Sequence, residues 1–447
     1  MPPSRPRLRA EDVRIVRIAV PAFAALVAEP LMLLADTAIV GRLGTTPLAG
    51  LSVASTVLLT FVGLCVFLAY GTTAAVGRAL GSGDRRAALA LGVDGLWLAA
   101  SIGVVAAAVA AGAARPVVGL FGTSDAVADQ AVTYLAISAI GIPAMLVVLA
   151  ATGVLRGLQD LRTPLVVMIA ANVVNAVLSV TLVHVVGLGI AGAAIGTVLA
   201  QLAAATWLVA VVVRVARSHG APLGPTRTGL AQASRAGVAL VVRTLTLRAA
   251  LLLATFAAAA QGDASLAAQQ VAVTVVSVVA YALDSIAIAG QTLTGHALGA
   301  SDPAGARRLT RRMVGWGVAS GVVAALVVVA LHRVLPGWFS GDDEVRAVLV
   351  PALLVVAVIQ PVSGVVFVLD GVLIGAGDGA YLAWAGVATL VAYVPLVVAV
   401  WATDAGLTWL WVAYGGFMLA RMATLVLRER SDRWLVTGAT AHVPPTS

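Results

Sequence analysis

Long apolar runs separated by short polar turns occupy most of the chain, from about residue 18 to residue 427. A run of about 20 apolar residues can cross a lipid bilayer as an α-helix. The runs predict spans at 18–41, 48–72, 92–114, 131–154, 165–186, 190–213, 238–260, 266–292, 313–334, 348–373, 380–402 and 406–427. Strands of a transmembrane barrel would instead alternate apolar and polar residues. The pattern therefore predicts an all-α polytopic membrane protein of about twelve transmembrane helices.

The two halves of the chain repeat each other. The stretch GRALGSGD at 77–84 matches GHALGASD at 295–302, which sets a constant offset in residue number, 295 − 77 = 218. The same offset pairs Pro143 with Pro361 and Gly153 with Gly371. Duplication of a six-span unit is the simplest account, and six spans return the chain to the side where it started. We therefore expect two six-helix bundles related by a pseudo-two-fold axis along the membrane normal.

Polar segments divide the chain around this repeat. We expect residues 1–213 to form an N-terminal six-helix lobe and residues 236–430 a C-terminal one. Residues 214–235, with Gly220, Pro222 and Pro225, form the longest polar interruption and are predicted to be a cytoplasmic linker that is partly helical from Gly229 onward. Residues 431–447 are predicted to be a cytoplasmic tail. The first apolar run is too long for the core of a cleavable signal peptide, so we expect it to remain as a helix.

The basic residues set the expected orientation. All 28 of them are Arg, and nearly all lie near the termini, in the turns after even-numbered spans or in the 214–248 segment. By the positive-inside rule both termini should be cytoplasmic, in a multi-pass protein of the inner or plasma membrane. The net charge of +8 therefore reflects topology, and no nucleic-acid partner is expected.

Acidic residues inside apolar spans are the first functional candidates, because an acid in hydrocarbon is costly to bury. Asp36 lies deep in the first span and is predicted to bind and release a proton or cation. Glu29 lies seven residues earlier, about two helical turns away on the same face. Asp284 and Asp370 lie in the second half of the chain, where an interhelical hydrogen bond is the alternative interpretation. The repeat offset places no acid opposite any of these aspartates.

Uncharged polar side chains complete the candidate substrate cavity. They are Asn172, Asn175, Ser179, Thr197 and Gln291, and such groups either line a wet cavity or join helices. Four further charged or ionisable residues, Asp94, His184, Arg248 and Arg421, fall near predicted span ends, where contact with headgroups is the expected role.

Motifs of soluble enzymes are absent from the sequence. No phosphate-binding loop ending in Lys-Ser or Lys-Thr occurs, and no His/Cys cluster has metal-ligand spacing. We therefore expect no enzyme activity, no cofactor and no metal site. An ion gradient would have to supply the energy for uphill transport, and a buried aspartate can harness one.

The residues resemble one transporter family. The run ADTAIVGRLG at 35–44 and the twin turns at 77–84 and 295–302 look like multidrug and toxic compound extrusion (MATE) transporters. The stretches LDGVLIGA at 369–376 and ALDSIAIAGQ at 282–291 resemble the DinF-like branch in particular. The resemblance covers about residues 15 to 430.

The resemblance implies two six-helix bundles in a V and alternating access. It also implies export of organic compounds, often cationic and lipophilic, in exchange for protons or sodium. The coupling aspartate of the first helix matches Asp36. Many prokaryotic members carry Asn-x-x-x-Asp in the fifth helix, whereas here Asn175 is followed by Ser179, so Asp36 is the principal titrating group. Leu247 stands where other branches carry a glutamate.

We therefore expect a proton-coupled antiporter that acts as a monomer among membrane lipids on small organic substrates. Proton coupling is the simpler chemistry because a sodium site needs several oxygen ligands around one carboxylate. The alternatives are a sodium-coupled drug exporter and a lipid-linked precursor flippase. An intramembrane enzyme would need paired acids such as Asp-x-x-x-Asp at a cytoplasmic mouth, and the sequence has none.

Overall fold

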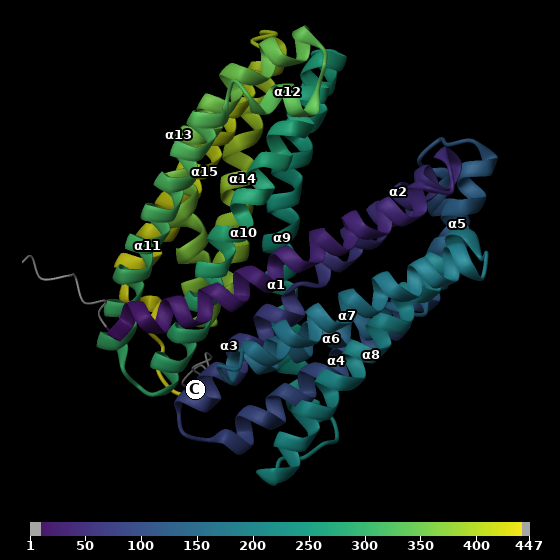
Figure 1. Cartoon of the computed structure of the whole chain (residues 1–447). Helices are drawn as coiled ribbons and strands as arrows, with labels where there is room; N and C mark the ends of the chain where they lie inside the picture. Colours follow the sequence, from purple (N-terminus) through teal and green to yellow (C-terminus); the bar gives the residue numbers. More distant parts are fainter. Residues whose placement is uncertain (1–9, 440–447) are drawn as a thin grey trace, which may run out of the picture. The chain divides into compact units, whose positions relative to one another are not determined.

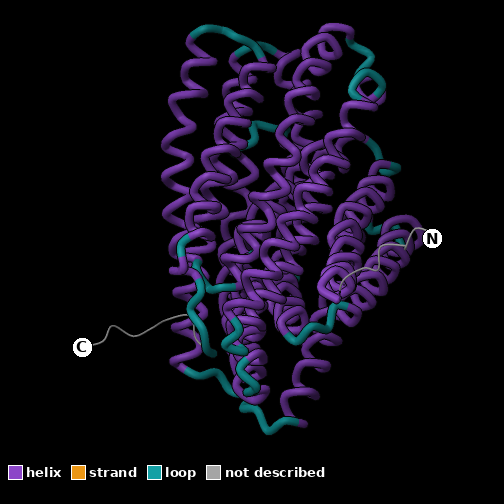
Figure 2. The backbone as a smooth tube through the Cα atoms, turned by 90° about the vertical axis from the view of Figure 1, so that its left-hand side faces the viewer, coloured by secondary structure: helices purple, strands orange, loops and turns teal. Residues whose placement is uncertain are grey.

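The structure is a computed structural model that describes residues 10–439, apart from the side chains of Ala10 and Glu29. The described chain contains no strand, and loops lie at the ends of its helices (Figure 2). The elements, drawn in Figure 1, are α1 (Ala10–Gly41), α2 (Thr45–Cys65), α3 (Phe67–Gly81), α4 (Arg85–Gly119), α5 (Asp125–Ala139), α6 (Ile142–Gly157), α7 (Arg162–Val180), η1 (Thr181–Val185), α8 (Gly189–Ser218), α9 (Arg227–Ala260), α10 (Asp263–Gly299), α11 (Pro303–Leu331), α12 (Leu335–Phe339), α13 (Asp343–Gly375), α14 (Gly379–Ala402), α15 (Leu407–Arg430) and η2 (Asp432–Trp434).

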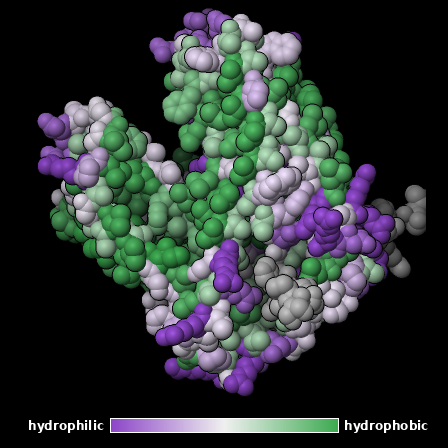
Figure 3. Space-filling model, turned by 180° about the vertical axis from the view of Figure 1, so that it is seen from behind, coloured by the Kyte–Doolittle hydropathy of each residue, from purple (hydrophilic) through white to green (hydrophobic). Residues whose placement is uncertain are grey.

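The helices are long and apolar enough to cross a membrane. In the described residues 11 of them qualify, or up to 12 when the bent pair α5 and α6 counts as one span. Hydrophobic residues cover the length of the helices and hydrophilic residues gather towards their ends (Figure 3). Helices are the expected form because each satisfies its backbone hydrogen bonds within one segment. The prediction of an all-α polytopic membrane protein is confirmed.

Helix bounds confirm the internal repeat. The repeat offset carries the start of α2 at Thr45 onto Asp263 of α10, and the end of α3 at Gly81 onto Gly299. It also carries the start of α4 onto that of α11, the outer ends of the α5 and α6 pair onto those of α13, and the start of α8 onto that of α15. The twin turns agree as well, because Asp84 accepts from the backbone N–H of Ala87 at 2.8 Å and Asp302 from that of Gly305 at 2.7 Å.

Close helix contacts repeat as well. A Cβ on Gly103 would lie 2.5 Å from Cα of Pro143, and one on Gly321 would lie 2.7 Å from Cα of Pro361. The two prolines therefore occupy equivalent places against equivalent helices. One difference is a break of 53° between α5 and α6 beside Gly141, whereas α13 continues through the equivalent Ile359. A Cβ on Gly141 would lie 2.4 Å from Oε1 of Gln201, so glycine leaves room for that side chain at the break.

By its internal contacts the chain divides into two compact units. The N-terminal unit is Ala24–Gly237, and the C-terminal unit joins the residues up to Phe23 with those from Val238 onward. The sequence repeat alone assigns the start of α1 to the first half. The contacts of this segment place it in the C-terminal unit instead, because Asp12 accepts from two side chains of α11. These are Arg312 Nε at 2.6 Å and Trp316 Nε1 at 2.9 Å.

The connection between α8 and α9 is short and held in place. Only residues 219–226 are non-helical, fewer than the predicted linker 214–235. Asp94 of α4 accepts from the backbone N–H of Thr226 at 2.7 Å and from its hydroxyl at 2.8 Å. The sequence-based expectation of a headgroup contact for Asp94 is therefore wrong, because its buried carboxylate anchors the start of α9. The predicted tail begins with η2, where the side chain of Trp434 is buried.

Candidate functional site

Asp36 lies on α1 within the N-terminal unit, and its side chain is only 3% exposed. Its nearest polar partner is Asn175 of α7, whose Nδ2 donates to Asp36 Oδ1 at 3.0 Å. These two residues come from segments 139 positions apart in the chain. The fold therefore brings the predicted coupling aspartate against the predicted asparagine of the fifth span.

Two hydroxyls complete the network around Asn175. Ser179 Oγ donates to Asn175 Oδ1 at 3.2 Å, one turn further along α7. Thr197 Oγ1 of α8 lies 3.2 Å from the same oxygen and 3.0 Å from the carbonyl oxygen of Ala193. The amide of Asn175 is thus fixed with its NH₂ group towards Asp36, because its oxygen already accepts from hydroxyls.

Small residues let α7 and α8 approach at this level. A Cβ on Gly196 would lie 2.9 Å from Ser179 Oγ and 3.0 Å from Ser179 N. An apolar cluster that includes Ile39, Val40 and Tyr134 buries the next part of α1. The polar network is therefore set within packed hydrocarbon, where an unpaired polar group would be costly.

The electrostatics of Asp36 differ from those of an ordinary buried acid. Among the described residues, no Arg or His lies within salt-bridge distance of it. Its carboxylate is stabilised by neutral hydrogen-bond donors, so protonation breaks no ion pair. The carboxyl group of Asp36 can therefore bind and release a proton. If the side-chain amide of Asn175 flips so that its oxygen faces Asp36, the same residues offer oxygen ligands to a small cation.

Two other candidates lie near this network in the chain. Asn172 is half-buried and its Nδ2 donates to the carbonyl oxygen of Ala28 at 2.8 Å, so it joins α7 to α1. Glu29 lies on α1, but its side chain is outside the described part of the structure.

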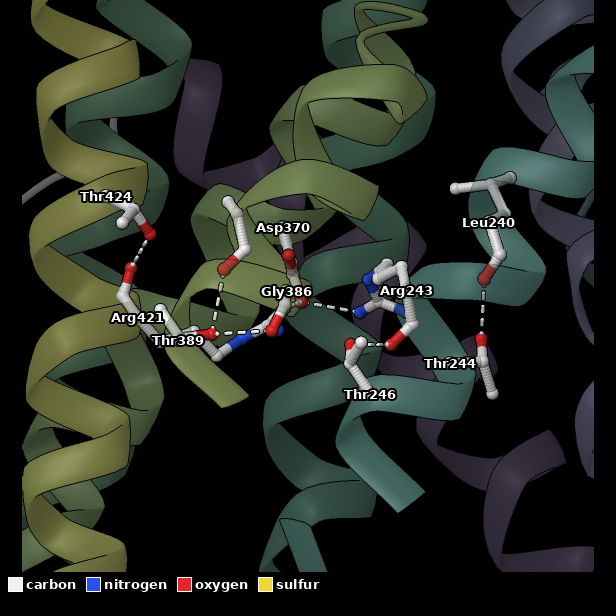
Figure 4. Close-up of polar contacts among 10 residues, drawn as sticks. Leu240, Arg243, Thr244, Thr246, Asp370, Gly386, Thr389, Arg421 and Thr424 are labelled. Atoms are coloured by element: carbon white, nitrogen blue, oxygen red, sulfur yellow. Dashed lines mark hydrogen bonds and ion pairs between the residues drawn. The ribbon is translucent and has the colours of Figure 1, made fainter. Parts of the chain in front are cut away.

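Asp370 of α13 belongs to a different kind of site, in the C-terminal unit. Its Oδ2 accepts from Arg243 of α9 and from Arg421 of α15, each at 2.5 Å (Figure 4). The carboxylate is 5% exposed and lies between the two guanidinium groups. Two adjacent cations favour its charged form, so this aspartate is held in ion pairs.

Sequence reasoning missed Arg243 and misjudged Arg421, which was expected to contact headgroups at a span end. Arg421 is 2% exposed, so that expectation is wrong. The available signal was the rarity of charges within apolar helices, since such charges usually pair with each other. No pattern in the sequence indicated that both arginines would form ion pairs with Asp370.

The remaining candidates lie on α10. Asp284 is half-buried and Gln291 is 2% exposed, two helical turns further along. Asp370 pairs with arginines rather than with either of them. In the part of the chain that the structure describes, no group of three or more His, Cys, Asp or Glu side chains could hold a metal ion.

Comparisons with known proteins agree with this architecture. The MatE family model matches residues 21–181 and 239–399, one match in each half. Protein DETOXIFICATION 44, chloroplastic, of Arabidopsis thaliana is 30% identical, over 97% of this chain and 85% of its own length. DNA damage-inducible protein F of Escherichia coli K12 is 30% identical, over 83% of this chain and 82% of its own length.

A solved structure, that of the Vibrio cholerae MATE transporter VcmN in the bent form, has the same fold. Its TM-score is 0.85 at 21% identity, over 95% of this chain and 98% of that one. Two family matches, each covering one repeat, together span most of the chain. The chain therefore belongs to the MATE family of multidrug efflux transporters, with relatives in its DinF-like branch.

Proposed function

We propose that the protein exports organic compounds, often cationic and lipophilic, in exchange for protons by alternating access. The observation that carries this proposal is the environment of Asp36, a buried carboxylate that is hydrogen-bonded to the neutral amide of Asn175. A proton on such a group changes its charge without leaving an uncompensated partner. The acid can therefore alternate between two states during a transport cycle.

Asp370 is the weaker candidate for coupling. Protonating it would neutralise the carboxylate that the buried Arg421 and the half-buried Arg243 share, and breaking a buried ion pair is costly. The proposal therefore assigns coupling to the N-terminal unit. Asn172, Asn175, Ser179, Thr197 and, by position, Glu29 are its cavity candidates, while Asp284, Gln291 and Asp370 are candidates for binding in the C-terminal unit.

Sodium coupling is the second candidate, and one observation favours it. Asp36, Asn175, Ser179 and Thr197 bring side-chain oxygens from four residues into one buried network. Hard cations prefer such oxygen ligands. However, Asn175 turns its NH₂ group towards Asp36, which suits a hydrogen-bonded carboxyl better than a bound cation.

The setting follows from the family and the Arg pattern. The protein is a multi-pass membrane protein, and we place it in the cell membrane with both termini in the cytoplasm. Its proposed partners are small organic substrates, protons and the surrounding lipids, and the proposed working form is a monomer.

The test is efflux of a fluorescent organic cation from proteoliposomes, with a pH gradient or a sodium gradient imposed separately. Efflux by the wild-type protein should be driven by the pH gradient and not by the sodium gradient. Asp36→Asn should lose that response by at least about tenfold, because the amide keeps the shape of the acid but does not bind and release a proton in this pH range. The matched control is Asp129→Asn, an exposed acid on α5 of the same unit.

Two results would contradict the proposal. Export by Asp36→Asn at the wild-type rate would remove Asp36 from coupling. Export driven only by the sodium gradient would mean that sodium, not the proton, is the coupling ion at Asp36.

A further inference from the structure

One face of α11, in the C-terminal unit, carries three exposed arginines near the start of the helix. They are Arg308, Arg311 and Arg312, and their spacing of three and four residues places them on one side of the helix. By the helical rise they lie roughly 7 to 14 Å from the first residue of α11. The whole helix, at about 43 Å, is as long as a bilayer with its headgroups is thick. The arginines therefore lie where headgroups meet hydrocarbon.

Further along, the same face of α11 is first open and then apolar. A Cβ on Gly315 would meet nothing within 4 Å, and Ala319, one turn later, is exposed. Val323 and Leu326 follow with 60% and 63% of their surface exposed. The face thus passes from positive charge through small residues to hydrocarbon. A phospholipid has the same order of parts, from phosphate through glycerol to acyl chains.

The start of α1 engages only one of the three arginines through a close ion pair. Asp12 accepts from Arg312 Nε at 2.6 Å and from its Nη2 at 2.7 Å, and Glu11 also attracts this arginine. Trp316, half-buried one turn beyond Arg312, donates its Nε1–H to the same Asp12 at 2.9 Å. Tryptophan is enriched where a membrane meets water, so this indole indicates the same level in the bilayer as the arginines.

The other two arginines are left to bind an anion. The acid nearest to Arg308 is Asp302, at 3.9 Å, and both of these side chains are more than half exposed. Arg311 has no acid within salt-bridge distance among the described residues. Residues 1–9, which the structure does not describe, contain three arginines and no acid. They cannot supply the missing negative charge.

Topology alone does not account for arginines on this face. The repeat offset carries the three arginines onto Ala90, Val93 and Asp94 of α4. The N-terminal unit places its own pair, Arg85 and Arg86, at the first two positions of α4. Arginine at the very start of a helix already satisfies the positive-inside rule. Arginines one to three turns deeper, on an exposed face, call for a separate explanation.

The corresponding face of α4 is covered by the chain itself. The repeat offset carries Gly315 onto Trp97, whose Nε1 donates to the carbonyl oxygen of Leu223 at 2.9 Å. One turn earlier, Asp94 binds Thr226. The connection between α8 and α9 therefore lies over this part of α4. In the described C-terminal unit no segment takes that place at Gly315, so the surrounding lipid can reach it.

We propose that the exposed face of α11, from Arg308 to Leu326, binds an anionic phospholipid. Its phosphate lies between Arg308 and Arg311, since guanidinium groups bind phosphate oxygens in pairs. Its glycerol part lies over Gly315 and its acyl chains run along the apolar residues. The site goes beyond proton-coupled export and beyond general lipid contact, because it selects one headgroup charge at one place in the C-terminal unit.

The test is native mass spectrometry of the purified full chain in detergent. The protein is titrated with dioleoyl phosphatidylglycerol or with dioleoyl phosphatidylcholine, which has the same acyl chains and a zwitterionic headgroup. The double variant Arg308→Gln/Arg311→Gln removes two charges from α11. The matched control Arg85→Gln/Arg86→Gln removes the same charge from the start of α4, where both arginines are exposed.

Wild type should bind one phosphatidylglycerol at least about tenfold more tightly than phosphatidylcholine, because each arginine near the headgroup attracts the anion. Arg308→Gln/Arg311→Gln should lose this preference, and the matched control should keep it. Thermal unfolding without added lipid should give equal midpoints for these proteins, since the changed side chains are exposed.

A second variant tests the place of the lipid without changing any charge. Gly315→Trp introduces the residue that the other repeat carries at this position, and its ring would occupy the space assigned to the glycerol part. It should weaken phosphatidylglycerol binding by about tenfold. Glycerol 3-phosphate, which has the phosphate but no acyl chains, should not displace the lipid.

Four results would overturn the site. They are equal affinity of wild type for the two lipids, equal phosphatidylglycerol binding by the double variant and its matched control, wild-type binding by Gly315→Trp, and displacement by glycerol 3-phosphate. The last result would indicate a site for free phosphate instead of a lipid. Asp36→Asn should bind phosphatidylglycerol like wild type, so failure of the lipid site and failure of proton-coupled export are distinguishable.

Discussion

At the scale of residues, Asp36 and Asp370 show how neighbours decide what a buried acid can do. Asp36 accepts from the neutral amide of Asn175, whereas Asp370 accepts from Arg243 and Arg421. A neutral partner tolerates either protonation state. Two cations require the carboxylate, because removing one member of a buried ion pair leaves charge uncompensated.

This difference predicts opposite effects on stability. Asp370→Asn should destabilise the protein by about 3–5 kcal/mol, because the buried Arg421 and the half-buried Arg243 lose their shared counter-ion. Asp36→Asn should change stability little, since the amide oxygen still accepts from Asn175. Thermal unfolding of both variants in the same detergent checks this. Equal unfolding midpoints would show that the Asp370 ion pairs contribute nothing to the fold.

Ser179 offers a second residue-scale prediction. Ser179→Asp places a second carboxylate beside Asn175, and two carboxylates attract a cation more strongly than one. Coulomb attraction at 4 Å is about 4 kcal/mol at an effective dielectric constant of 20, so sodium binding should tighten at least tenfold. Efflux under an imposed sodium gradient measures the gain, and Ser179→Asn is the uncharged control. Identical sodium dependence in the two variants would contradict it.

At the scale of elements, the repeat makes a prediction about helix packing. A Cβ on Gly153 of α6 would lie 2.4 Å from the carbonyl oxygen of Ala69, and one on Gly371 of α13 would lie 2.2 Å from that of Ala287. Gly153→Ala and Gly371→Ala should each destabilise the protein by about 1–3 kcal/mol. The new Cβ would overlap a backbone oxygen, which can move away only if the neighbouring helix shifts.

The matched control is Gly315→Ala on α11, where a new Cβ would meet nothing within 4 Å. It should stabilise the protein by about 0.4–1 kcal/mol, since alanine restricts the unfolded chain. Thermal unfolding midpoints rank the three variants. A stable Gly371→Ala protein beside an unstable Gly153→Ala protein would mean that the two helix pairs do not pack alike.

Element positions were largely predictable because apolar length alone identifies a span. The helices extend beyond the predicted runs, as with α9, which begins at Arg227 rather than near residue 238. The sequence could not reveal the anchor of that extension, because Asp94 and Thr226 are 132 positions apart. The break beside Gly141 could not be predicted either. Both repeats carry a proline at the equivalent position, Pro143 and Pro361, yet only the first repeat is broken there.

The sequence also indicated which residue types belong to the N-terminal network, but not how they connect. Asp36 was found by its charge, and Asn175 and Ser179 by their spacing in one apolar run. The contacts between them depend on how α1, α7 and α8 pack, which a single sequence does not encode locally. The role of these residues in coupling stays a prediction.

At the scale of the whole molecule, a duplicated scaffold carries different chemistry in its two units. Helix bounds and close contacts repeat at one constant offset in residue number, yet Asp36 corresponds to Ala254 and Thr152 to Asp370. Backbone geometry was therefore retained after duplication while the polar groups diverged. The two units therefore differ in their buried acids, since Asp36 is hydrogen-bonded to a neutral amide and Asp370 is paired with two arginines.

The Arg pattern gives a prediction for the topology of the entire chain. Cys65 is the only cysteine and is buried, so Cys65→Ala provides a background for single-cysteine labelling. Ser82→Cys and Ser218→Cys follow even-numbered spans, and Ser124→Cys and Thr403→Cys follow odd-numbered ones. All four positions are exposed in the structure.

A membrane-impermeant maleimide added to intact cells should label Ser124→Cys and Thr403→Cys, because the arginine-poor turns face outward. Ser82→Cys and Ser218→Cys should react only after the membrane is opened, since the arginine-rich turns stay in the cytoplasm. Labelling after permeabilisation is the control that each cysteine is reactive. Reaction of Ser218→Cys in intact cells would mean that an odd number of spans precedes it, and the six-plus-six arrangement would then be wrong.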